Sequence, residues 1–196
     1  DAINELKPVL GIELTATPID ERGNQFRNVV YEYSLAKALT DGLYVKNPTI
    51  AKRRDFNPAG RSIEEIEKIK LEDAVSIHED TKQELKLYAL NTGRRLVKPF
   101  ILVVCRDTAH AKSVYDLVSS SDFYNGAFEN KVLQIDSTTR NEELIEQQFV
   151  SLENEDNEIE IVIHVNMLKE GWDVTNLYTI VPLRAANASI LVEQTI

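Results

Sequence analysis

A short polar loop between two apolar runs carries residue types suited to nucleotide chemistry. The loop is Glu170-Gly171-Trp172-Asp173, and the apolar runs cover residues 161–165 and 178–183. Each run is long enough for a strand that is buried on both faces. In an open parallel sheet, ligands bind where loops leave the carboxyl ends of strands, so two carboxylates beside a glycine suggest a phosphate or ribose contact. Taken alone, the loop favours a plainer interpretation, a tight turn that buries Trp172.

Arg106 follows another apolar run, residues 100–105. A guanidinium at the carboxyl end of a strand suits contact with a DNA phosphate, which positions a protein on the duplex without reading its sequence. A salt bridge to Asp107 or to a neighbouring residue explains Arg106 equally well. The sequence leaves both interpretations open.

A third strand end, after residues 132–136, is followed by Ser137 and Thr138. Hydroxyl groups ahead of a helix suit a phosphate, because the free amides and the dipole of the helix add to their attraction. Capping of the helix by Thr139 accounts for the same composition. Phosphate binding and capping are therefore both retained here.

The elements that must position these loops alternate between strand and helix. Apolar runs predict strands at 100–105, 132–136, 161–165 and 178–183, and helical spacing of apolar residues predicts helices after the first two. This order predicts an α/β fold in which helices cover a parallel sheet. Further upstream, Ser62 and Glu65 form a capping box, and Gly93 ends the pattern, so we expect one or two helices over residues 61–93.

The first fifty residues give weaker patterns. An apolar run at 9–14 and the β-rich residues 29–33 suggest strands, and a further strand is expected from Leu43. Between them, Ser34 can cap a helix that Gly42 is well placed to end.

The cysteine and the histidines of the chain give no clear signal of a metal site or a nucleophile. Cys105 is the only cysteine, so we expect it to pack as a small hydrophobe, with neither an internal disulfide nor a thiolate cluster. His78-Glu79-Asp80 has no second histidine at ligand spacing, so we interpret it as a solvated helix face and predict no metal site. His110 has no sequence partner that marks it as catalytic, and we place it on the surface.

The charge of the chain is unevenly distributed. The formal net charge is −10, which opposes DNA binding because phosphate contacts rely on Lys and Arg. Residues 141–160, however, hold eight acidic residues and no Lys or Arg, and the remainder carries only −2. We interpret the acidic segment as a solvated helix and loop, and the nearly neutral remainder can hold a local basic groove. No apolar run approaches a membrane span and the first residues lack a signal-peptide pattern, so a cytoplasmic location without membrane contact is the default expectation.

Three segments in order resemble a known family. Leu14-Thr15-Ala16-Thr17-Pro18 and the stretch EGWDVTNLYTIVPLRAANASILVEQTI resemble the third, fifth and beginning sixth motifs of superfamily-two helicase-like ATPases. The chain most resembles the Res (restriction) subunit of type III restriction enzymes. The strand, turn and helix around Arg106 resemble the fourth motif of that family. The resemblance covers nearly the whole chain and is weakest between Arg61 and Gly93.

The resemblance implies a domain arrangement. Residues 1–41 would be the tail of a first RecA-like lobe, and residues 42–196 would be a second RecA-like lobe. This second lobe would be a three-layer parallel sheet with helices on both faces, a helical insertion at about 61–93, and a truncated C-terminal end. We expect the chain to be a piece of a larger protein.

The resemblance also assigns roles to residues. Thr15, Ala16 and Thr17 would couple nucleotide state to DNA. The remaining assignments are ATP contacts at Glu170, Gly171, Asp173 and Gln194, and DNA backbone contacts at Arg106, Ser137, Thr138 and Asn166.

The sequence lacks several parts that ATP hydrolysis needs. It has no Gly-Lys pair for a P-loop, no aspartate-glutamate box for magnesium, and no arginine fingers after Gln194. The complete protein would use ATP and Mg²⁺, whereas this piece alone is expected to be inactive and to bind neither tightly. The family further implies double-stranded DNA and a methyltransferase (modification) subunit as partners.

Two other functions remain open at this point. The chain could be a non-catalytic α/β module that binds nucleic acid or a protein partner through its acidic face, or part of a strand-separating superfamily-two helicase outside restriction. A small-molecule methyltransferase is disfavoured because no Gly-rich loop follows an early strand.

Overall fold

The computed structural model describes residues 9–12, 14–15, 18, 23–43, 49–135, 142–154, 156–165 and 174–183, with the side chains of 142–146 left out. The chain divides into two compact units, with the boundary between Ile50 and Ala51. The second unit holds the sheet and most of the helices.

The sheet of the second unit is parallel throughout. In the described part of the chain it has four strands, β1 (Phe100–Val104), β2 (Val132–Ile135), β3 (Ile161–His164) and β4 (Leu177–Pro182). Their order across the sheet is β2-β3-β1-β4, and every neighbouring pair is parallel. The helix α4 (Thr108–Val118) links β1 to β2, and α5 (Glu142–Ser151) links β2 to β3. The prediction of an α/β fold with a parallel sheet is confirmed.

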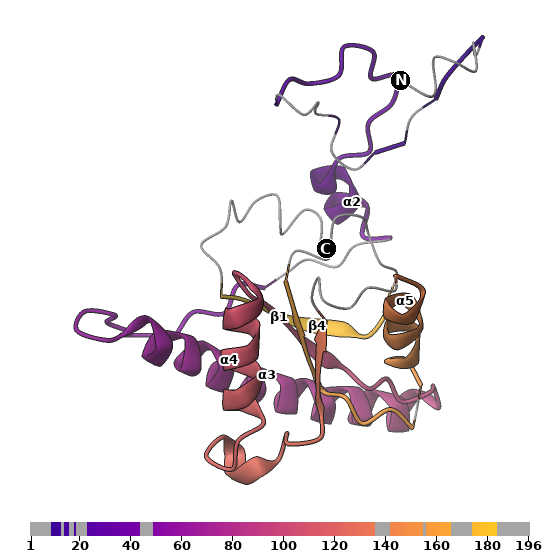
Figure 1. Cartoon of the computed structure of the whole chain (residues 1–196). Helices are drawn as coiled ribbons and strands as arrows, with labels where there is room; N and C mark the ends of the chain where they lie inside the picture. The colour runs from indigo at the N-terminus through magenta and orange to yellow at the C-terminus, as the bar shows by residue number, and fades with distance from the viewer. Residues whose placement is uncertain are drawn as a thin grey trace. The chain divides into compact units, whose positions relative to one another are not determined.

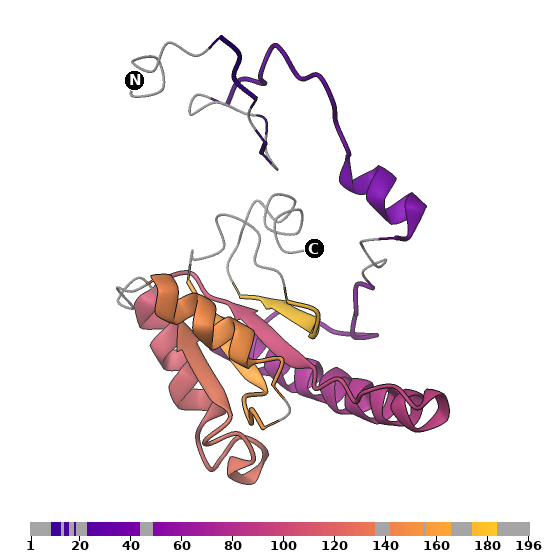
Figure 2. The same cartoon turned by 90° about the vertical axis from the view of Figure 1, so that its right-hand side faces the viewer.

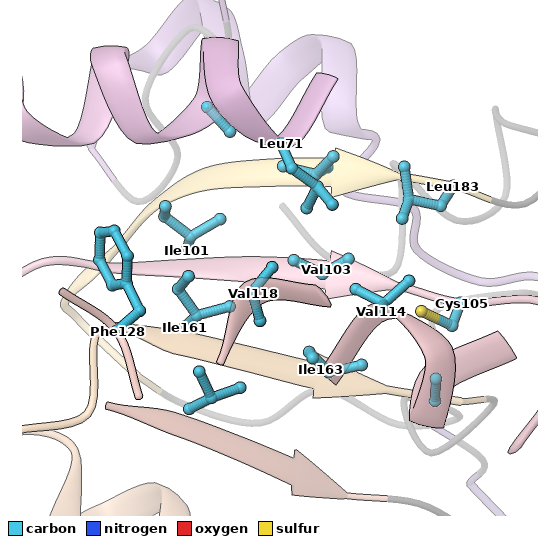
Figure 3. Close-up of a cluster of buried hydrophobic side chains, with 14 of the residues drawn as sticks. Leu71, Ile101, Val103, Cys105, Val114, Val118, Phe128, Ile161, Ile163 and Leu183 are labelled. Carbon is cyan, nitrogen blue, oxygen red and sulfur yellow. The ribbon is translucent and has the colours of Figure 1, made fainter. Parts of the chain in front are cut away.

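Helices cover both faces of this sheet, and each face has its own apolar core. On one face, Ile101, Val103 and Cys105 pack with α4 and with the helix α3 (Ile63–Thr92), as Figure 3 shows. On the other face, Phe100, Leu102 and Val104 pack with Phe149 and Leu152 of the α5 region. Figure 1 shows α4 and α5 on opposite sides of the strands. The alternation follows from strand geometry, since successive side chains point to opposite faces.

A single helix, α3, occupies the region where one or two helices were expected. The capping box is formed as predicted: Glu65 N–H donates to Ser62 Oγ and Ser62 N–H donates to Glu65 Oε2. Gly93 ends the helix in the left-handed conformation. The buried residues of α3 lie between Glu67 and His78, and the C-terminal part of the helix continues beyond the sheet in Figure 2. None of the helices in the described residues combines the length and apolar character that a membrane crossing requires.

The first unit contains the helix α2 (Leu35–Asp41), capped by Ser34 and ended by Gly42 as predicted. The strands expected nearby are not formed by the described residues. Residues 29–33 have no regular structure, and the described part of 9–14 lies in no strand. The strand expected from Leu43 lies outside the described residues except for Leu43 itself. Most of these apolar side chains are exposed, including Val9, Leu14 and Val30. High β propensity does not produce a strand without a partner for its backbone groups.

The fourth strand also differs from its prediction. β3 is buried along its whole length, but β4 buries only alternate residues: Thr179 and Val181 are buried, whereas Tyr178 and Ile180 are exposed. Among the described strands β4 is at the edge of the sheet. β4 pairs with β1. Val181 packs against Leu71 and Val75 of α3, so α3 covers the face of β4 that is buried, and Tyr178 and Ile180 lie on the opposite face.

Truncating the central strand tests this packing. We expect Ile101→Ala to lower the free energy of unfolding by about 2–5 kcal/mol, because a fully buried isoleucine leaves a cavity when truncated. The same change at exposed Ile63 should alter it by less than about 0.5 kcal/mol. Urea denaturation followed by circular dichroism measures both, and equal effects would contradict the packing.

Candidate functional site

All four strands end together at the carboxyl edge of the sheet. Val104 lies opposite His164 on one side and Pro182 on the other, and His164 lies opposite Ile135. Backbone hydrogen bonds continue one residue further, from Cys105 N–H to the His164 carbonyl and from Leu183 N–H to the Val104 carbonyl, both at 2.9 Å. The four strand ends that precede the predicted site residues therefore lie at one edge, the edge at which open parallel sheets bind ligands.

Arg106 is held at this edge by a buried carboxylate from α3. Arg106 Nη1 donates to Glu67 Oε1 at 2.7 Å, and His110 Nε2 lies 3.0 Å from Glu67 Oε2. The side chains of Glu67 and His110 are 10% and 6% exposed, whereas that of Arg106 is 43% exposed. The salt-bridge interpretation of Arg106 is thus confirmed with Glu67 as the partner. Its capacity to contact phosphate stays a prediction.

The hydrogen bonds around His110 fix the position of its proton. The backbone N–H of Arg106 donates to His110 Nδ1 at 3.2 Å, so Nδ1 is an acceptor and the ring proton of the neutral imidazole is on Nε2. Nε2 then donates to Glu67. Asp107 caps α4 by accepting the His110 backbone N–H at 2.8 Å. The expectation that His110 is a surface residue is wrong, because Glu67 satisfies its ring in the protein interior.

Sequence reasoning overlooked Glu67. Its signal was its spacing: Glu67 precedes the buried residues Leu71, Ala74 and Val75 on the same helical face. A carboxylate on an apolar helical stripe must find partners in the interior. Those partners, Arg106 and His110, lie 39 and 43 residues away along the chain, and the local sequence does not identify them.

Most of the predicted site residues lie outside the described residues. These are Ala16, Thr17, Ser137, Thr138, Asn166, Glu170, Gly171, Asp173 and Gln194. Thr15 is described, and it is an exposed residue of the first unit without regular structure. No family model, curated protein or solved structure matches the chain. The roles of these residues therefore remain proposals that depend on the sequence motifs and on the loops from which the residues come.

A second polar cluster surrounds Glu160, which directly precedes β3 and so lies at the amino edge of the sheet. Glu160 Oε1 accepts a hydrogen bond from Lys131 Nζ at 2.6 Å. Glu160 Oε2 accepts one from Lys82 Nζ at 2.8 Å and lies 3.1 Å from His78 Nε2. Burial alone would raise the pKa of Glu160, but these hydrogen bonds outweigh burial and hold the pKa well below its usual range. Burial likewise lowers the pKa of Lys82, and its bonds to Glu160 and Glu79 reverse that effect and raise it.

The Glu160 cluster corrects the prediction for His78-Glu79-Asp80. His78 is fully buried, and only the two acidic residues are exposed. Ligand atoms of His78, Glu79 and Glu160 lie within 4.8 Å of one another, close enough for a cation. Two ammonium groups already neutralise Glu160, so the geometry favours a structural ion-pair network. The acidic segment is therefore not wholly solvated, because Glu160 is partly buried. Glu153 is exposed, and its carboxylate accepts the backbone N–H of Thr175 at 2.7 Å.

Cys105 packs as predicted. It is fully buried, and its backbone N–H belongs to the ladder between β1 and β3. Burial, with the nearby charge of Glu67, raises the pKa of the thiol to about 12. The thiol therefore stays protonated at neutral pH and is unsuited to nucleophilic chemistry.

A surface hollow near the C-terminal end of α4 is a weaker candidate. It is lined by Arg53, Asp73 and Tyr124 among others. Arg53 pairs with Asp73 at 2.9 Å, and the Tyr124 hydroxyl donates to a backbone carbonyl of α3. Because α4 starts at the carboxyl edge and runs back across the sheet, this hollow lies away from the loops that carry the predicted site.

The Glu160 network gives a stability prediction. Glu160→Gln should lower the free energy of unfolding at neutral pH by about 2–3 kcal/mol, since the change leaves two lysines and a buried histidine without their carboxylate. The pKa of Glu160 is lower in the folded than in the unfolded protein. The stabilisation is therefore complete above the unfolded value of about 4.3 and is lost as the pH falls below it.

The matched control is Glu158→Gln, which removes the same charge from an exposed side chain two residues earlier. Urea denaturation at several pH values should show a deficit for Glu160→Gln that shrinks below pH ~4.3, and almost no deficit for Glu158→Gln. A Glu160→Gln deficit that is constant with pH would contradict the charge network.

Proposed function

We propose that the chain belongs to an ATP-driven DNA motor, the Res subunit of a type III restriction enzyme or a near relative. Residues 42–196 would be the second RecA-like motor lobe, and residues 1–41 the tail of the first. The parallel sheet with helices on both faces is compatible with such a lobe. The order of the three sequence motifs supports the narrower assignment.

The observation that carries the proposal is the common carboxyl edge. Four strands end in register there, and the segment of sequence after each of them contains residues proposed to touch DNA or nucleotide. Arg106 follows β1, Ser137 and Thr138 follow β2, the segment from Asn166 to Asp173 follows β3, and Gln194 follows β4. The strand ends from which these segments continue thus lie at one edge, as a shared binding surface requires.

The proposed division of labour follows from the resemblance to the family's motifs. Glu170, Gly171, Asp173 and Gln194 would contact ATP between the lobes, while Arg106, Ser137, Thr138 and Asn166 follow the DNA backbone. The complete protein would hydrolyse ATP with the help of Mg²⁺. It must provide the P-loop, the acidic box and the arginine fingers. The change in lobe separation would pass through Thr15, Ala16 and Thr17 to double-stranded DNA. A methyltransferase subunit would recognise the target.

The acidic segment offers less support for a partner-binding module. Glu153 and Glu160, two of its eight carboxylates, are used inside the second unit, where they bind Thr175 and the His78 cluster. These two groups stabilise the fold, so only the remaining acidic residues could form an acidic docking face.

The nucleotide role of Asp173 can be tested in the complete protein. We expect Asp173→Ala to abolish DNA-stimulated ATP hydrolysis, because a carboxylate proposed to bind between the lobes is lost, and to leave the unfolding transition in place. The control is Asp156→Ala, at an exposed acidic position in the loop before β3. A phosphate-release assay measures turnover. Unchanged turnover in Asp173→Ala would remove this residue from the site.

A further inference from the structure

We propose that Glu67, together with His110, is a positioning device that holds Arg106 ready for a backbone phosphate of DNA. This inference depends on the proposed function and deepens it, because it gives the long helix α3 a role at the DNA-facing edge. It names a residue, Glu67, to which the sequence motifs assign nothing.

The main chain and the side chain of Arg106 are held by the same pair of residues. Glu67 Oε1 accepts from the guanidinium at 2.7 Å, and His110 Nδ1 accepts from the Arg106 backbone N–H at 3.2 Å. Glu67 and His110 also contact each other, because Glu67 Oε2 lies 3.0 Å from His110 Nε2. These contacts connect α3 to the start of α4. They fix the positions of both the backbone N–H and the guanidinium of Arg106.

The burial of the three side chains fits this role. Glu67 and His110 are buried and Arg106 is partly exposed, with side-chain exposures of 10% for Glu67, 6% for His110 and 43% for Arg106. A guanidinium has five N–H donors in a rigid fork. The contacts described here use one of them, at Nη1, so donors remain for a phosphate. A buried partner reduces the rotamer freedom that a long side chain loses on binding.

Charge alone predicts the opposite effect of Glu67. A carboxylate 2.7 Å from a phosphate-binding arginine repels the phosphate and competes for the guanidinium. If Glu67 acted only through its charge, its removal would strengthen DNA binding. If Glu67 positions Arg106, its removal weakens binding although the protein becomes less negative. The sign of the change therefore separates the two roles.

The test measures binding of a short DNA duplex by the complete protein, using fluorescence anisotropy at several salt concentrations. Glu67→Gln should weaken binding about fivefold to tenfold, a loss of the size expected when one charged contact is mispositioned. The duplex concentration that half-saturates ATP hydrolysis should rise by the same factor, with the maximal rate unchanged. The matched control is Glu64→Gln, which removes an exposed carboxylate from the same helical turn and should leave binding equal or slightly tighter.

A double-mutant cycle separates positioning from a general loss of structure. In an Arg106→Ala background, Glu67→Gln should have no further effect on DNA binding, because the residue that it positions is gone. Arg106→Ala itself should reduce the dependence of affinity on salt by about one phosphate contact. An additive effect, or tighter binding by Glu67→Gln, would overturn the inference.

The outcomes also separate this inference from the proposed function. If Arg106→Ala leaves affinity and salt dependence unchanged, the DNA role of Arg106 fails, and the inference fails with it. If Arg106→Ala weakens binding but Glu67→Gln does not, only the positioning role fails. Should Glu67→Gln not fold, Glu67→Asp replaces it: the negative charge stays but the shorter side chain no longer reaches Arg106 and His110 together, so weaker binding supports the inference and wild-type affinity overturns it.

Discussion

The backbone ladder of β1 is the constraint on which the rest of the second unit depends. β1 pairs in parallel with β3 on one side and with β4 on the other, and all five of its side chains are buried. The backbone N–H and C=O groups of a strand in that position can form hydrogen bonds only with the neighbouring strands. Its apolar side chains must then be covered on both faces. The helices α3 and α4 cover one face and α5 covers the other, so the three-layer arrangement follows from this one strand.

The same ladder determines where function can be located. Because the strands are parallel and in register, their carboxyl ends form a single edge, and the loops of the proposed motor leave from it. The buried Glu67 and the partly buried Glu160 have different positions relative to that edge. Glu67 binds the partly exposed Arg106 at the carboxyl edge, whereas both oxygens of Glu160 are bound by lysine and histidine at the amino edge. The partly exposed guanidinium of Arg106 suits the binding of an anionic ligand, whereas the neutralised carboxylate of Glu160 suits stabilisation of the fold.

The sequence predicts the second unit well because its determinants are local. The apolar runs identify β1 to β4, and Ser62, Glu65 and Gly93 mark the ends of α3. The positions of Glu67, His78 and His110 depend instead on partners that are distant in sequence, and all three are buried against hydrogen-bonding partners. The burial pattern of β4 was mispredicted for a related reason. Its apolar run does not reveal that, among the described strands, it is at the edge.

Local propensity was least informative in the first fifty residues. Residues 29–33 are rich in β-branched and aromatic side chains, but strand formation requires a neighbouring strand, and the described residues there form none. Ser34 and Gly42, by contrast, act within a single helix, and their predicted roles are confirmed. Interactions that close within a few residues were predictable, and those that need a distant partner were not.

ATP hydrolysis by the complete protein tests the central claim most directly, with duplex DNA, single-stranded DNA and no DNA compared side by side. A restriction-type motor that moves on duplex predicts hydrolysis stimulated chiefly by duplex. Stimulation chiefly by single strands would contradict that assignment and favour a strand-separating helicase. Absence of hydrolysis under all three conditions would contradict the motor itself and leave a binding module as the better account.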